Sequence, residues 1–164
     1  MTTGDTFLPS PDVAAAAVVE LASANQPRGA DEGLDLLRAI GVYDGTLRPI
    51  EDGSSRVAVE ASGPWRGTDS GLVIDPGGAV THFWSHLWFG NSPEVLLANF
   101  DATAVAIATA IGSPDEEDRR DDGSRSVLWR RQPVAIEFYL HAERPRAGAV
   151  AQIGISWADG THPK

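Results

Sequence analysis

Residues 71–89, GLVIDPGGAVTHFWSHLWF, are the stretch that decides the fold. Two apolar, β-branched and aromatic runs flank Asp75-Pro76-Gly77-Gly78, which combines residues that favour tight turns. Alternating side chains in the second run are typical of a strand. The stretch therefore predicts an antiparallel β-hairpin.

Outward from this hairpin, the chain alternates helical and extended patterns. Ser10-Pro11-Asp12 and Ser92-Pro93-Glu94 each place a capping hydroxyl, a proline and an acid at a helix start. Helices are expected at residues 11–24, 31–40 and 93–111. Further strands are expected at residues 55–61, 126–131, 133–141 and 149–157. Residues 115–125, DEEDRRDDGSR, lack an apolar period and are expected to form a charged, solvated loop.

Short strings recur at an offset of about 70 residues. Ala39-Ile40-Gly41 returns as Ala110-Ile111-Gly112, and Gly78-Ala79-Val80 returns as Gly148-Ala149-Val150. An even offset preserves which face of a strand each side chain occupies. The sequence therefore predicts one α+β domain over residues 1–164, with pseudo-repeats at about 31–90 and 93–158. Each would be an α-β-β-β unit, giving a largely antiparallel sheet of about six strands with helices on one face.

Composition narrows the classes of function. Thirteen basic and twenty-three acidic residues give a formal net charge of −10. This field repels phosphate backbones and argues against a nucleic-acid partner. The chain contains no cysteine, which fits the reducing cytoplasm. No apolar stretch is expected to approach the roughly 20 residues of a membrane span, so no membrane association is predicted.

The candidate site lies in the second strand of the hairpin. Alternation sends Phe83, Leu87 and Phe89 to the core and turns four side chains to the opposite face: His82, Trp84, His86 and Trp88. A face that only met water would be polar. We also expect a neighbouring strand to contribute Glu137, Tyr139 and His141 to this binding surface. The competing interpretation is a second core, with the rings packed beneath a helix or loop.

Metal and catalytic templates are not met. Histidines four residues apart share a metal on a helix, but on a strand His82 and His86 would be roughly 13 Å apart. No Gly-x-Ser-x-Gly elbow and no phosphate-binding glycine loop occurs. We therefore predict no metal, no other cofactor and no catalytic residue.

The order of elements resembles small uncharacterised actinobacterial proteins and, more loosely, immunity proteins of bacterial polymorphic toxin systems. The resemblance covers roughly residues 31–158, through strings such as Ile111-Gly112-Ser113-Pro114 and Trp129-Arg130-Arg131. It implies a non-catalytic protein that binds a partner, such as a basic toxin. It implies no particular binding residues.

Three functions remain open. The first is a protein-binding module of the immunity or chaperone type, which uses the sheet face or acidic loops. The second is a small-ligand-binding protein or enzyme with a cavity lined by His82, His86 and His141. The third is a homodimer joined through the sheet face.

Overall fold

The computed structural model describes residues 9–49, 55–90, 92–142 and 149–157. In this part of the chain three α-helices and one short 3-10 helix accompany eight strands. The helices are α1 (Pro11–Ser23), α2 (Ala30–Ala39), η1 (Gly63–Trp65) and α3 (Pro93–Ile111). The strands are β1 (Tyr43–Pro49), β2 (Arg56–Ala61), β3 (Asp69–Ile74), β4 (Val80–Gly90), β5 (Glu116–Arg119), β6 (Arg125–Arg131), β7 (Val134–His141) and β8 (Ala149–Trp157).

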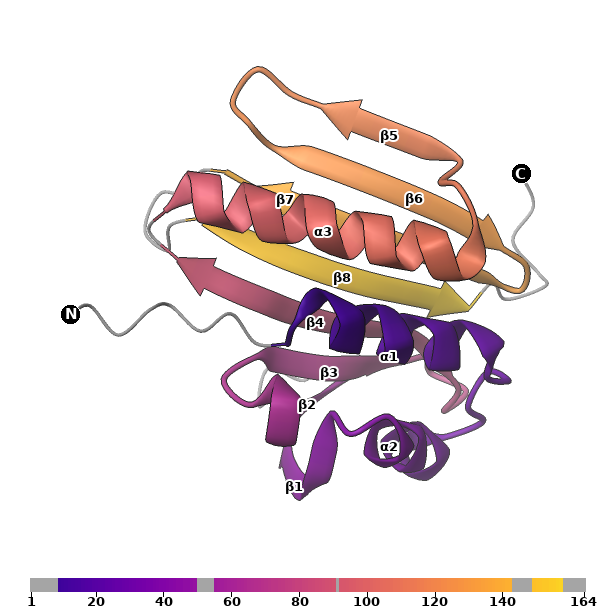
Figure 1. Cartoon of the computed structure of the whole chain (residues 1–164). Coiled ribbons are helices and arrows are strands. Elements are labelled where there is room, and N and C mark those ends of the chain that lie inside the picture. Colours follow the sequence, from indigo (N-terminus) through magenta and orange to yellow (C-terminus); the bar gives the residue numbers. More distant parts are fainter. Residues whose placement is uncertain (1–8, 50–54, 91, 143–148, 158–164) are drawn as a thin grey trace.

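All eight strands form one antiparallel sheet, in the order β1-β2-β3-β4-β8-β7-β6-β5 (Figure 1). Each half of the chain contributes a four-stranded meander, and the last strands of the two meanders pair at the centre of the sheet. A helix followed by four strands thus occurs in each half of the chain, and the pseudo-repeats at about 31–90 and 93–158 stay a prediction. The α+β class and the antiparallel sheet are confirmed.

The expected number of about six strands is wrong, because the two edge strands were missed. β1 contains Gly45 and Pro49 and shows no apolar alternation. β5 lies within the predicted charged loop, so residues 116–119 of that loop are in fact a strand, and all four of its side chains are exposed. Edge strands bond on one side only and are often short or charged. Their composition therefore resembles loops, and each repeat has four strands rather than three.

The predicted hairpin is confirmed as β3 and β4. The backbone N–H of Gly78 donates to the carbonyl of Asp75, and the Asp75 side chain accepts from Ala79 N–H at 2.9 Å. Gly78 has a φ of 95°, which a glycine adopts without steric cost. The turn chemistry read from the sequence is therefore what closes this hairpin.

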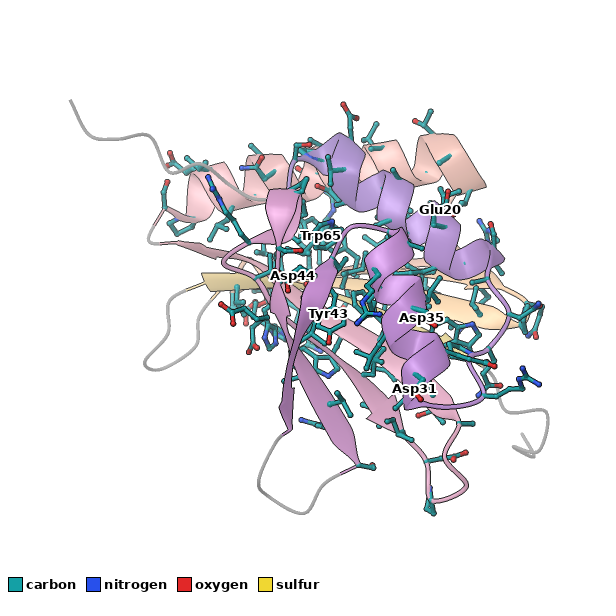
Figure 2. All side chains as sticks on the ribbon, turned by 90° about the horizontal axis from the view of Figure 1, so that it is seen from below. Glu20, Asp31, Asp35, Tyr43, Asp44 and Trp65 are labelled. Carbon is teal, nitrogen blue, oxygen red and sulfur yellow. The ribbon has the colours of Figure 1, made fainter. Side chains whose placement is uncertain are left out.

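The helices lie on one face of the sheet and bury the core against it (Figures 1 and 2). Ser10 caps α1 by accepting from Val13 N–H at 3.4 Å, and α3 ends at Gly112, where φ is 96°. Phe100 of α3 stacks on Phe138 of β7 with ring centroids 4.2 Å apart. Strand residues that face the helices, such as Phe83 and Ile153, are almost fully buried.

Within the described residues, α3 is long and apolar enough to cross a membrane by length and composition alone. This corrects the expectation that no stretch approaches such a length. Four α3 residues are buried in the protein: Leu96, Phe100, Thr103 and Ile107. A core helix of this length meets the same criterion, so the helix does not by itself indicate a membrane role.

Candidate functional site

The face of the sheet opposite the helices carries the candidate site, and we call it the open face. Cross-strand register defines it, since directly paired residues share a face. One row runs Tyr139, Gln152, His86, Asp69 across β7, β8, β4 and β3, and the next runs Glu137, Gly154, Trp84, Gly71. No described helix covers this face (Figure 2).

Two glycines make room for the rings of β4. A Cβ at Gly154 would lie 3.0 Å from the His82 ring, and a Cβ at Gly71 would lie 2.8 Å from the Trp84 indole. His82 therefore lies over β8, and Trp84 lies over β3. The rings lie close against the neighbouring backbones, and their side chains are half-buried.

His82 is tied to the neighbouring strand by a side-chain hydrogen bond. Its Nδ1 lies 2.8 Å from the Ser156 hydroxyl. Burial is the main cause that lowers the pKa of His82; the Glu137 carboxylate raises it, and Arg56 lowers it slightly. The imidazole is therefore neutral near pH 7, and it presents one donor and one acceptor.

Trp84 and His86 form the middle of the open face. Their ring centroids are 5.5 Å apart, and His86 Nδ1 lies 3.5 Å from a carboxylate oxygen of Asp69. The Trp84 indole N–H is buried without a hydrogen-bond partner among the described residues. Such a group typically costs about 1–3 kcal/mol, so this ring is held in place by packing alone.

The β7 side chains face the same way, one strand beyond β8. Tyr139 donates a short hydrogen bond to the Glu137 carboxylate, and its ring lies 5.9 Å from the His141 ring. Burial, followed by this hydrogen bond, raises the pKa of Tyr139 well above its usual value. Tyr139 therefore stays protonated and serves as a donor. The structure thus places six predicted residues on one face: His82, Trp84, His86, Glu137, Tyr139 and His141.

The seventh, Trp88, does not follow the predicted alternation. The register between β4 and β8 shifts after His86, so Trp88 pairs with Ala151. Ala151 is fully buried in the core beneath the helices. The simple alternation of side chains between the two faces, which placed Trp88 beside His86, therefore cannot be extended past this bulge. Its side chain lies outside those that the structure describes.

Carboxylates gather beside these rings, where β5, β6 and β7 form a broad groove of about 550 Å³. Much of this charge is already matched. Glu116 pairs with Arg130 at 2.6 Å, and Asp115 pairs with Arg131 at 3.0 Å. Hydrogen bonds from the Arg130 N–H and Arg131 hold the pKa of Asp115 below its usual value. The ring cluster, rather than this groove, is therefore taken as the candidate site.

The arrangement does not converge on a metal or a deep pocket. No group of three histidine, cysteine or acidic side chains among the described residues could hold a metal ion. No histidine lines any of five clefts formed by described residues. What the open face offers is flat contact area with hydrogen-bonding groups at its edges.

Sequence reasoning missed the residues that support the rings. Ser156, Gly154 and Asp69 were not among the predicted site residues. These residues become recognisable only when β4 is known to lie between β3 and β8. The spacing of Gly71 and Gly154 within apolar strands was the available signal, since a glycine inside a strand often marks a close approach.

Comparison with known proteins adds information on the fold. No family model and no curated protein sequence matches this chain. A solved structure with a similar fold is that of a DUF4309 family protein (YjgB) from Bacillus subtilis. The TM-score is 0.50 at 9% identity, over 92% of this chain and 99% of that one. A likeness at this identity concerns the fold alone.

Proposed function

We propose that this protein is a non-catalytic binding module of the immunity or chaperone type, which docks a partner protein on its open face. The observation that supports this proposal is the position of the rings. Trp84, His82 and His86 occupy the middle of the sheet face that no described helix covers. A face that served only solvent would carry small or charged side chains there.

The composition of this face resembles that of a protein interface. Aromatic side chains are enriched at the centres of interfaces, and polar groups form the rim. Here Trp84 is bordered on one side by the polar residues Asp69, Glu60 and Arg56, which occupy the same face of β2 and β3. Rigid rings lose little side-chain entropy when a partner covers them.

The charge of the chain favours a basic partner. A net charge of −10 attracts positively charged surfaces over long range and accelerates encounter at low salt. The same charge opposes self-association, because two copies would repel each other. Light scattering tests this point. If the wild type forms a stable dimer and Trp84→Glu does not, the homodimer joined through the sheet face replaces the present proposal.

The test is capture, followed by reconstitution. Tagged wild type and a Trp84→Ala/His86→Ala variant are incubated with lysate of the native cells, and retained proteins are identified by mass spectrometry. A retained protein is then purified and titrated by calorimetry. We expect the double variant to lose at least about thirtyfold in affinity, as removal of an interface hot spot does.

Val105→Ala on α3 is the matched control, because Val105 is 66% exposed and lies on the helix side of the molecule. It should bind as wild type does. Hydrogen exchange should show protection of β4, β7 and β8 in the complex. Protection confined to the helices, or equal affinity of all three proteins, would contradict docking on the open face.

One contact favours a second candidate, an enzyme that uses Ser156 as nucleophile. Ser156 is hydrogen-bonded to His82, and Glu137 acts electrostatically on the same imidazole. A serine, a base and an acid are the parts of a nucleophilic site. Covalent labelling by a fluorophosphonate probe, abolished in Ser156→Ala, would favour this candidate. An unlabelled wild type would remove it.

A further inference from the structure

A cleft on the opposite side of the molecule has no part in the proposed docking. It lies between α3 and the β5–β6 hairpin and has a volume of about 230 Å³. Its floor is apolar and includes Phe100, Trp129 and Val127. Because these side chains belong to the buried core, the floor is fixed rather than collapsible.

The cleft exists because α3 presents alanines to the hairpin. Ala104 and Ala108 line it, and at the offset of 70 their counterparts in the first repeat are Leu34 and Arg38. There Arg38 lies over the Tyr43 ring, 5.3 Å from its centroid, and α2 packs directly against β1 (Figure 2). Large side chains close the helix onto the edge strand in one half, and small ones leave it open in the other.

Two arginines border the opening. Arg119 and Arg125 are directly paired across β5 and β6, and like charges in such a position repel. Both line the cleft. Arg125 is paired with Asp101 at 3.0 Å, whereas Arg119 takes part in no ion pair with any described residue. Glu117 lies on the same rim, and no ion pair joins it to either arginine.

We propose that the cleft binds a small organic carboxylate, with its compact apolar body over Phe100 and Trp129 and its carboxylate beside Arg119. An anion at that point pairs with the Arg119 guanidinium, which no described carboxylate matches, and forms charge-assisted hydrogen bonds with it. Its body fills the space that Ala104 and Ala108 leave. The volume limits the ligand to roughly the size of one apolar side chain with its acid group.

The test uses 3-phenylpropanoate as a probe and 3-phenylpropanamide as its uncharged counterpart. Each is titrated into the full chain to about 10 mM, a range suited to ligands of this size, while amide chemical shifts are recorded. We expect saturable shifts around α3 and the β5–β6 hairpin. The amide should bind about tenfold more weakly than the acid, through loss of the charged contact.

Variants separate the two parts of the proposal. Arg119→Gln should bring the affinity for the acid down to that for the amide and leave the amide unchanged. Ala104→Leu, which introduces the residue of the first repeat, should abolish binding of both probes. Ala98→Leu adds the same bulk at an exposed α3 position outside the cleft and should bind as wild type does. Ala108→Leu replaces Ala104→Leu if the latter does not fold.

Three results would overturn the proposal. They are no saturable shift with either probe, equal affinities for acid and amide, and undiminished binding by a folded cleft-filling variant. None of these results tests the proposed docking on the open face, because the cleft and the open face lie on opposite sides of the sheet. Loss of the proposed docking function would likewise leave this test unaffected.

Discussion

β4 and β8 are equivalent strands of the two repeats, they pair with each other at the centre of the sheet, and their open faces differ. β4 presents His82, Trp84 and His86, whereas β8 presents small or neutral residues opposite them. On the helix side the two strands are alike, since Phe83 pairs with Ile155 and both are buried. The two strands are therefore alike where they face the core and differ where they face away from the helices.

The open faces of β4 and β8 also complement each other in size. The imidazole of His82 occupies the space above Gly154 and lies within hydrogen-bond distance of Ser156, so small residues of β8 make room for this ring of β4. His82 of the first half thus depends on small residues of the second half, whereas Trp84 depends on Gly71 of its own half. Changes that exchange the features of the two halves should break this relation.

The largest effect is expected where the second half carries a larger core residue. Trp129 is fully buried, its indole donates to the Gly112 carbonyl at 3.0 Å, and its counterpart in the first half is Val59. Trp129→Val should lower the free energy of unfolding by about 3–4 kcal/mol through a cavity and an unpaired carbonyl. Urea denaturation followed by circular dichroism measures this.

Trp129→Phe provides the control for that prediction. It keeps most of the ring volume and loses the hydrogen bond, so it should cost about half as much. Equal losses for the two variants would mean that the bond to Gly112, rather than packing, accounts for the effect.

The next effect separates the two glycines beneath the rings. A Cβ at Gly71 would lie 2.5 Å from the Val57 carbonyl oxygen, which is backbone. A Cβ at Gly154 would be crowded by the His82 ring alone, at 3.0 Å, because the Phe83 carbonyl oxygen lies at an ordinary contact distance of 3.8 Å. Gly71→Ala should therefore destabilise by about 2–3 kcal/mol and Gly154→Ala by about 1 kcal/mol or less. The same denaturation measurement applies. The reverse order would show that His82 is held more rigidly than β2.

A smaller effect is expected at the β7 edge of the ring cluster. Tyr139→Phe removes the donor to a half-buried carboxylate and should cost about 1 kcal/mol. Tyr139→Phe combined with Glu137→Gln should recover part of this loss, because the amide is neutral. In wild type the raised pKa of Tyr139 means that its stabilising contribution is complete below the unfolded pKa of about 10 and is lost as pH rises above it. Absorbance of the phenolate in the near ultraviolet reports that titration.

The smallest effect concerns pH and His82. The folded pKa of His82 lies below that of the unfolded chain, so the folded state binds fewer protons in the window between them. The contribution of His82 is therefore complete above about pH 6.5 and decreases as pH falls from there toward the folded pKa. His82→Gln should show a flatter dependence of the urea midpoint on pH in this window. Parallel curves for the two proteins would contradict this assignment.

Prediction from sequence succeeded where local pattern and tertiary contacts agreed. The hairpin around Asp75, the three helices and the strand β7 were all predicted within a few residues. The hydroxyl of Ser10 caps α1 as expected, whereas the Ser92 side chain makes no capping hydrogen bond at the start of α3. It failed at β1 and β5, where no apolar period marks the strand, and at the register shift after His86, which the apolar alternation through Phe89 does not reveal. At such positions the backbone is determined by the partner strand.

What the amino-acid sequence by itself determined is the three helices, the six inner strands and the apolar side of most of those strands. Periodicity, caps and turns are local properties of the chain. Only the tertiary structure decided that β4 lies between β3 and β8, and hence that His82 meets Ser156 and Trp84 lies over Gly71. Contacts between residues 74 positions apart depend on strand order, which arises from burial of the whole core and is not encoded in any local pattern.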